Sequence, residues 1–231
     1  MTTERADLAS VRYRQITVNE QPDTTADPQS VGPPADGQLS GSGLAAEKAR
    51  RLGLVDAMRD AGGNPYPYRF DRSHTLGEMR ETWGHLEPGI ETADVVTVAG
   101  RIMLKRDSGK LVFTTIRDRS GDVQLFISKA VVGDDEFSAI KDLDLGDWVG
   151  VAGTVMTTRK GELSVKSDSV VLLSKAIRPM PDKWHGLNDT DTRFRQRYAD
   201  LIVNENARRN FEIRHETVAS FRRTLASKGF I

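Results

Sequence analysis

Apolar and polar residues alternate through the middle of the chain, where five segments show the spacing of β-strands. In Asp94–Leu104 the residues Val96, Val98 and Ile102 share one face, which predicts a half-buried strand. Two shorter segments at 111–118 and 123–128, each preceded by a turn that contains Ser-Gly, predict a three-stranded meander. Two further strands are predicted at 145–158 and 162–173, joined by a basic loop that contains glycine.

Between the third and fourth strands the pattern changes to helical spacing. Phe137 and Ile140 follow an acidic first turn, which suits the positive end of a helix dipole and predicts a short helix over 134–143. Five strands with one helix between the third and fourth is the element order of the OB-fold, a small Greek-key barrel that binds nucleic acids or sugars. We therefore expect a mainly β fold with flanking helices and a five-stranded OB-fold barrel over 94–175.

Helical patterns are expected on both sides of this barrel. Two helices, at 44–61 and at 75–82 after a cap at Ser73 or Thr75, are predicted within an N-terminal region of 44–93. A proline-broken hinge is expected over 176–203, followed by a long amphipathic helix over 204–231. Residues 1–43 are rich in Pro, Gly, Asp and Ser, and they predict a disordered tail.

Composition limits the partners and the compartment. The 231 residues contain 33 Lys plus Arg and 33 Asp plus Glu, so a polyanion must be bound by a local patch rather than by the net charge. The absence of cysteine excludes disulfides and thiolate zinc sites, and it makes the cytoplasm the simplest expectation. No apolar run has the length of a signal peptide core or a membrane span, so no membrane association is expected.

One face of the second and third strands carries residues suited to single-stranded nucleic acid. Phe113 offers an aromatic surface for a base, Gln124 and Phe126 lie one hairpin away, and Glu162 is an acceptor for a base N–H. Phosphate contacts are expected from the basic residues at the rim, which are Arg101, Lys105, Arg106, Lys110, Arg159 and Lys160. From these residues alone, oligosaccharide binding and protein interaction stay open, as does a packing role for Phe126.

No catalytic or metal-binding constellation is recognisable in the sequence. The four histidines, His74, His85, His185 and His215, lack metal-ligand spacing. A P-loop and a nucleophile elbow are also missing. We therefore expect no catalytic residue, no metal and no cofactor of its own for this chain.

A resemblance to a known family rests on the segment RPMPDKWHGLNDTDTRFRQRYADL, at 178–201. It resembles the junction segment of class II lysyl-tRNA synthetases, which reads close to RPLPDKWHGLxDxExRYRQRYLDL. Ala199 stands where the family has leucine, a small departure. The related aspartate and asparagine enzymes lack the Pro-Asp-Lys-Trp-His-Gly-Leu stretch. The similarity runs from about Leu52 to Ile231 and includes GKLVFTTIRD, GDVQLFIS and RKGELSV.

The resemblance implies a role for several residues. Phe113 matches the aromatic residue that stacks on an anticodon base, and Gln124 and Glu162 match the groups that read uridine edges of the lysine anticodon. Arg101 matches a basic anticodon contact. The partner implied is the anticodon stem-loop of lysine tRNA.

The resemblance also implies that catalysis lies elsewhere. The family is a homodimer that uses ATP and Mg²⁺, and the last helix, 204–231, resembles the start of its first class II motif. We therefore expect an incomplete dimer interface, with tRNA binding but no aminoacylation by this chain. An alternative is a stand-alone OB-fold module that pairs with a full-length synthetase subunit through its last helix, whose apolar residues include Phe221 and Leu225.

Overall fold

The computed structural model describes residues 41–181, 187 and 189–230. The expected disordered tail, apart from its last residues, lies outside the described part of the chain. The chain falls into two compact units. The first contains Leu44–Pro179, and the second contains the C-terminal residues from Met180 onward. None of the helices in the described part is long and apolar enough to cross a membrane.

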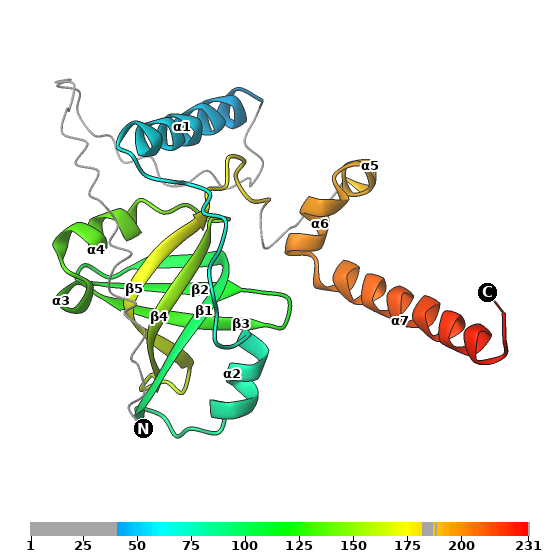
Figure 1. Ribbon diagram of the computed structural model, residues 1–231. Helices are drawn as coiled ribbons and strands as arrows, with labels where there is room; N and C mark the ends of the chain where they lie inside the picture. The colour runs from blue at the N-terminus through cyan, green and yellow to red at the C-terminus, as the bar shows by residue number, and fades with distance from the viewer. Residues whose placement is uncertain (1–40, 182–186, 188, 231) are drawn as a thin grey trace. The chain divides into compact units, whose positions relative to one another are not determined.

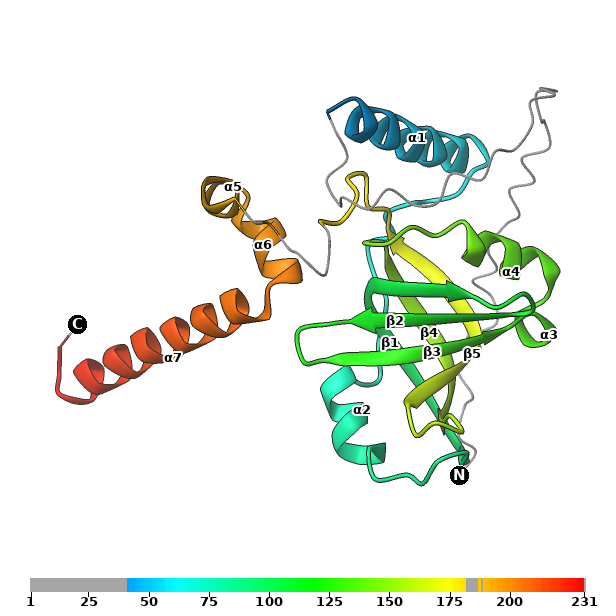
Figure 2. The ribbon, with the colours of Figure 1, turned by 180° about the vertical axis from the view of Figure 1, so that it is seen from behind.

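The first unit is built on a closed barrel of five strands (Figures 1 and 2). The strands are β1 (Glu91–Asp107), β2 (Leu111–Arg117), β3 (Asp122–Ser128), β4 (Trp148–Thr157) and β5 (Leu163–Ser174). Their order around the barrel is β1-β2-β3-β5-β4, with β3 and β5 parallel and the other neighbours antiparallel. Helices α3 (Lys129–Val132) and α4 (Asp134–Lys141) lie between the third and fourth strands. The predicted OB-fold order is confirmed.

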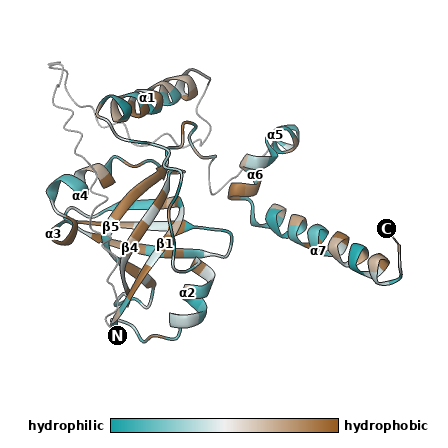
Figure 3. Cartoon of the chain, in the orientation of Figure 1, coloured by the Kyte–Doolittle hydropathy of each residue, from teal (hydrophilic) through white to brown (hydrophobic). Residues whose placement is uncertain are grey.

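The interior of the barrel is filled by the apolar residues that the alternation assigned to one face. On β2 the buried positions Val112, Thr114 and Ile116 alternate with the half-buried ones, and β3 shows the same alternation. Figure 3 shows hydrophobic colouring along β1, β4 and β5. Two helices close the core, because Phe137 and Ile140 of α4 join it, as do two residues of α2. The outward positions of β2 and β3 are therefore the ones available for binding.

An irregularity in β1 changes which of its residues point inward. The pairing of β1 with β2 shifts register between Ile102 and Leu104, as in a β-bulge. After this shift Lys105 lies opposite the buried Thr114, and Leu104 lies opposite the outward Thr115. A shift of one residue moves every later side chain to the other face of a strand. Lys105 is therefore directed inward, whereas strict alternation from Ile102 placed it outward.

Two helices precede the barrel and pack on it. Helix α1 (Gly41–Asp60) starts slightly earlier than predicted, and its buried Arg51 donates to the main-chain oxygens of Leu145 and Ala176, at 3.3 and 3.0 Å. Helix α2 (Leu76–Trp83) begins with a capping box in which Thr75 and Glu78 bond reciprocally. Thr75 is thus the cap, one of the two expected.

The described residues from 189 to 230, in the second unit, form the helices α5 (Thr190–Arg195), α6 (Arg197–Val203) and α7 (Glu205–Ser227). They meet around Asp200, which is fully buried and accepts hydrogen bonds from Arg193, Arg197 and Asn204. Asn204 also caps α7, since its side-chain oxygen accepts from the Ala207 N–H at 3.1 Å. The part of the expected hinge at 182–186 and 188 lies outside the described residues.

Candidate nucleic-acid interface

An aromatic pair stands on the outer face of β2 and β3. Phe113 lies directly opposite Phe126, with ring centroids 5.5 Å apart and planes at 74°, an edge-to-face contact. Both residues are half-buried, and Arg106 of β1, opposite Phe113, places its guanidinium 5.7 Å from the Phe113 ring centre. The contacts with Phe126 and Arg106 hold Phe113 in place. A rigid ring beside a cation is a suitable stacking platform for a base.

A polar row lies next to this pair along the same face. Gln124 of β3 sits between Thr115 of β2 and Ser164 of β5. Its amide nitrogen donates to Ser164 Oγ at 3.1 Å, and that hydroxyl donates to the main-chain oxygen of Glu162 at 3.0 Å. These two bonds fix the direction of the amide, which presents both donor and acceptor groups. They also connect Gln124 to Glu162, the residue expected to read a base together with it.

Glu162 lies in the hairpin between β4 and β5, at the end of this polar row. Its main chain closes the turn with Thr158, through a 2.9 Å bond from the Thr158 N–H to the Glu162 oxygen. Its side chain is 51% exposed, and its Oε1 accepts from Arg80 of α2 at 3.4 Å. The structure thus brings Phe113, Gln124 and Glu162 onto one continuous face.

Arg101 of β1 contacts the barrel through its guanidinium. Its guanidinium donates to the main-chain oxygen of Gly146 at 3.2 Å and lies 5.3 Å from the Trp148 ring centre. Burial lowers its pKa below the ordinary value. It pairs in the sheet with Arg117 and Trp148, at the far end of β2 from Phe113. These contacts tie the Arg101 side chain to the barrel, and its expected anticodon contact stays a prediction.

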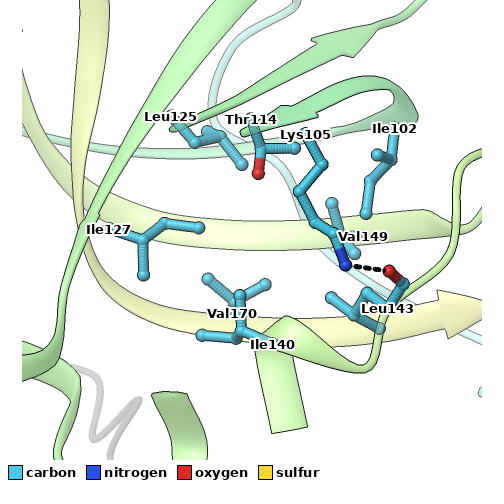
Figure 4. A pocket seen from close by; sticks show the side chains of 9 residues that line it. All are labelled: Ile102, Lys105, Thr114, Leu125, Ile127, Ile140, Leu143, Val149 and Val170. Carbon is cyan, nitrogen blue, oxygen red and sulfur yellow. Dashed lines mark hydrogen bonds between the residues drawn. The ribbon is translucent and has the colours of Figure 1, made fainter. Parts of the chain in front are cut away.

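Lys105 differs most from the expectation. Its ammonium donates to the main-chain oxygens of Lys141, at 2.6 Å, and of Leu143, where α4 ends. Figure 4 shows the side chain directed into an apolar pocket lined by Ile102, Ile127, Val149 and others. Burial lowers the pKa of Lys105. A cation at the negative end of a helix is stabilising, and this one is not directed at the surface where a phosphate would lie.

The remaining basic residues lie on exposed turns at the two ends of the face. Lys110 is in the turn between β1 and β2, next to the Phe113 end, and Arg159 and Lys160 are in the hairpin that carries Glu162. All three are exposed. Together with Arg106 they flank the aromatic pair and the polar row, in positions suited to a phosphate backbone.

Comparisons with known proteins agree with this geometry. A family model for tRNA anticodon domains, described as an OB-fold nucleic acid binding domain, matches residues 96–173. The matched residues cover most of the barrel, whose strand order is that of an OB-fold. The chain is also 43% identical to a lysine–tRNA ligase of Thermosynechococcus vestitus over 189 residues, which are 80% of this chain and 37% of the relative.

Two further relatives extend the comparison. A Bacillus subtilis lysine–tRNA ligase is 44% identical over 183 residues, or 78% of this chain and 37% of the relative. An Arabidopsis thaliana chloroplastic/mitochondrial lysine–tRNA ligase is 40% identical over 190 residues, which are 80% of this chain and 32% of the relative. Most of the chain is therefore homologous to lysine–tRNA ligases, and it spans about a third of the length of these relatives.

Sequence reasoning missed one contributor to the face of the OB-fold domain. Arg80 of α2 donates its Nε to the main-chain oxygen of Asp122 at 2.7 Å and a terminal nitrogen to Glu162. These partners lie 42 and 82 positions away in the sequence, so no local pattern indicates the contacts. Among the described residues no group of three His, Asp or Glu side chains could hold a metal ion.

Proposed function

We propose that this OB-fold domain binds the anticodon loop of a lysine tRNA, as the N-terminal region of a lysine–tRNA ligase. The observation that carries the proposal is the outer face of β2 and β3, where Phe113, supported by Phe126 and Arg106, adjoins the row from Gln124 to Glu162. An aromatic platform beside fixed donors and acceptors suits an unstacked base that is read along its edge. The homology to lysine–tRNA ligases supports the choice of tRNA.

Each residue has a separate role in this proposal. Phe113 stacks on one base regardless of its identity, and Gln124 and Glu162 pair with the polar edge of uridine. A uridine N3–H is a donor that a carboxylate accepts, whereas cytidine presents an acceptor at the same atom. Arg106, Lys110, Arg159 and Lys160 bind phosphates around the loop. We assign lysine activation with ATP and Mg²⁺ to the full-length cytoplasmic ligase and its dimer.

Fluorescence anisotropy with anticodon stem-loops tests these roles. Phe113→Ala should weaken the binding of every stem-loop by about 1–3 kcal/mol, the contribution of one stacked base. Glu162→Ala or Gln124→Ala should instead reduce the preference for UUU over loops with one cytidine, by about 0.5–1.5 kcal/mol. Lys160→Ala should lower all affinities alike and reduce the salt slope by about 0.7, the value of one phosphate contact on a single strand.

The matched control is Phe194→Ala in the second unit. Phe194 is 67% exposed and also lies under an arginine, since the Arg197 guanidinium is 4.8 Å from its ring centre. Its loss should leave binding unchanged. Equal effects of Phe113→Ala and Phe194→Ala, or no effect of Phe113→Ala, would contradict anticodon binding by this face.

A second function is favoured by α7. Its large apolar residues Phe211, Ile213, Val218, Phe221 and Leu225 are each more than 40% exposed. The alternative is that the chain pairs through α7 with a full-length ligase subunit. Sedimentation of the chain alone and with full-length enzyme tests this, and a monomer that does not associate with the added subunit excludes it.

A further inference from the structure

Helix α2 is fastened by its N-terminus to the turn between β2 and β3. The Leu76 N–H donates to Asp118 Oδ2 at 3.0 Å, and the Gly77 N–H donates to Ser120 Oγ at 2.7 Å. These two N–H groups have no partner within the helix, so the turn satisfies donors that would otherwise face solvent. The helix start is thus fixed to the strands that carry Phe113 and Gln124.

Two further contacts prevent α2 from turning or sliding. Leu76 and Met79 are fully buried in the barrel core, both at 0% exposure. At the other end, Trp83 donates its indole N–H to Asp94 Oδ2 at 2.8 Å. Movement of the helix would expose both apolar side chains and break this bond. A side chain on the outer surface of α2 is therefore held on a rigid support.

Arg80 uses this support to connect two parts of the interface. Its Nε donates to the main-chain oxygen of Asp122, the first residue of β3, at 2.7 Å. Its terminal nitrogen Nη2 donates to Glu162 Oε1 at 3.4 Å. Gln124 follows two positions after Asp122 on β3. The guanidinium therefore sets the position of the Glu162 carboxylate relative to the strand that carries Gln124.

We propose that Arg80 is a positioning residue for base discrimination, holding the Glu162 carboxylate where it accepts a base N–H. The inference rests on the proposed anticodon binding by the OB-fold domain. A carboxylate beside RNA is repelled by phosphates, and a neighbouring guanidinium offsets that repulsion. The Glu162 side chain is 51% exposed and lies on a hairpin, so without Arg80 it would sample several rotamers. Arg80 thereby favours uridine without touching the base.

The competing explanation is that Arg80 binds a phosphate directly. Removing a phosphate contact weakens binding of all sequences alike and lowers the salt slope by about 0.7. Removing a positioning residue lowers the preference for uridine and leaves the salt slope unchanged. The two explanations therefore differ in two measured quantities.

The test measures anisotropy of Arg80→Gln with a UUU stem-loop and with loops in which each uridine in turn is replaced by cytidine. At the position where Glu162→Gln reduces discrimination, Arg80→Gln should reduce it about two- to twelvefold, the range for one lost hydrogen bond. Arg80→Gln combined with Glu162→Gln should lose no more discrimination than Glu162→Gln alone. Arg80→Lys should recover part of the preference, because it restores the charge.

Arg59→Gln is the matched control. Arg59 of α1 has a 58% exposed side chain and lies 3.5 Å from the carboxylate of Asp56, an exposed pair like that of Arg80 with Glu162, and this pair lies within α1 rather than on α2 or the β2–β3 turn. It should leave discrimination unchanged. Unfolding midpoints of both variants, followed by urea titration, show whether a loss of discrimination reflects misfolding.

The outcomes separate this inference from the proposed function. If Phe113→Ala weakens binding while Arg80→Gln leaves discrimination intact or only lowers the salt slope, anticodon binding stands and the positioning role is wrong. If Phe113→Ala has no effect, the proposed function itself fails, whatever Arg80→Gln does. Reduced discrimination in a variant that folds normally supports the positioning role.

Discussion

Replacement of Asp147 by asparagine should destabilise the OB-fold unit strongly. The Asp147 carboxylate is fully buried, at 0% exposure, and accepts three hydrogen bonds. One comes from Lys175 Nζ at 2.7 Å, and the others come from the backbone N–H groups of Asp144 and Ala176, each at 2.8 Å. An amide has the same shape but only one acceptor oxygen, so its NH₂ group would face one of these donors.

The size of the effect follows from the burial of both charges. Lys175 is only 3% exposed, and breaking a buried ion pair costs about 3–5 kcal/mol, because the remaining charge loses its partner. Lys175 also donates to Asp144, so one carboxylate stays beside the ammonium in the variant. The expected loss of unfolding free energy is therefore at the lower end of this range, about 3 kcal/mol. With a urea m-value of about 2 kcal/mol/M, the midpoint should fall by about 1.5 M.

Urea unfolding followed by tryptophan fluorescence measures this change, since Trp83 and Trp148 lie in the unit. Arg69→Gln is the control, because Arg69 and Asp71 form an ion pair with 81% and 75% exposed side chains, and its midpoint should not change. In Lys175→Met, the further cost of Asp147→Asn should be smaller than in the native chain. If Asp147→Asn lowers the urea midpoint by less than about 0.5 M, the buried pair does not supply this stabilisation.

Other expected outcomes concern pH and packing. Hydrogen bonds from Arg50 and Arg51 lower the pKa of Glu47 from 4.5 to about 2. The ionised carboxylate therefore stabilises the fold above about pH 4.5, and this contribution is lost as the pH falls toward 2. Glu47→Gln should flatten the pH dependence of the urea midpoint between these values. Gly153→Ala would place a Cβ 2.1 Å from a backbone oxygen of β5 and should destabilise by about 3 kcal/mol. Gly53→Ala, in α1 with nothing within 4 Å, should raise the midpoint slightly.

The barrel could be predicted from the sequence because its strands alternate cleanly. The buried positions of β2 and β3 are those that a period of two assigns, and the helix between β3 and β4 shows its own period. The bulge after Ile102 could not be predicted, since Met103, Leu104 and Lys105 suit either face locally. The inward direction of Lys105 depends on its pairing with β2, a property of the folded sheet.

The candidate site could be predicted only where its residues lie on regular strands. Phe113 and Gln124 follow from the same alternation that defines the core, since outward positions on β2 and β3 are fixed once the inward ones are known. Arg80 belongs to a helix whose position depends on the β2–β3 turn and on buried side chains from distant segments. Contacts of this kind depend on tertiary structure, and the amphipathic pattern of α2 specifies only which of its residues are buried.

The distribution of cations on the interface limits the strength of electrostatic binding. Six basic residues were expected to meet phosphates, but Arg101 and Lys105 donate to main-chain oxygens of the barrel. The other four, Arg106, Lys110, Arg159 and Lys160, are exposed, and we propose that they bind phosphates. Because each phosphate contact on single-stranded RNA contributes about 0.7 to the slope of log affinity against log salt, a slope of about 3 is expected. A slope of about 4 or more would mean that Arg101 and Lys105 leave their barrel partners on binding, or that cations outside the OB-fold domain take part.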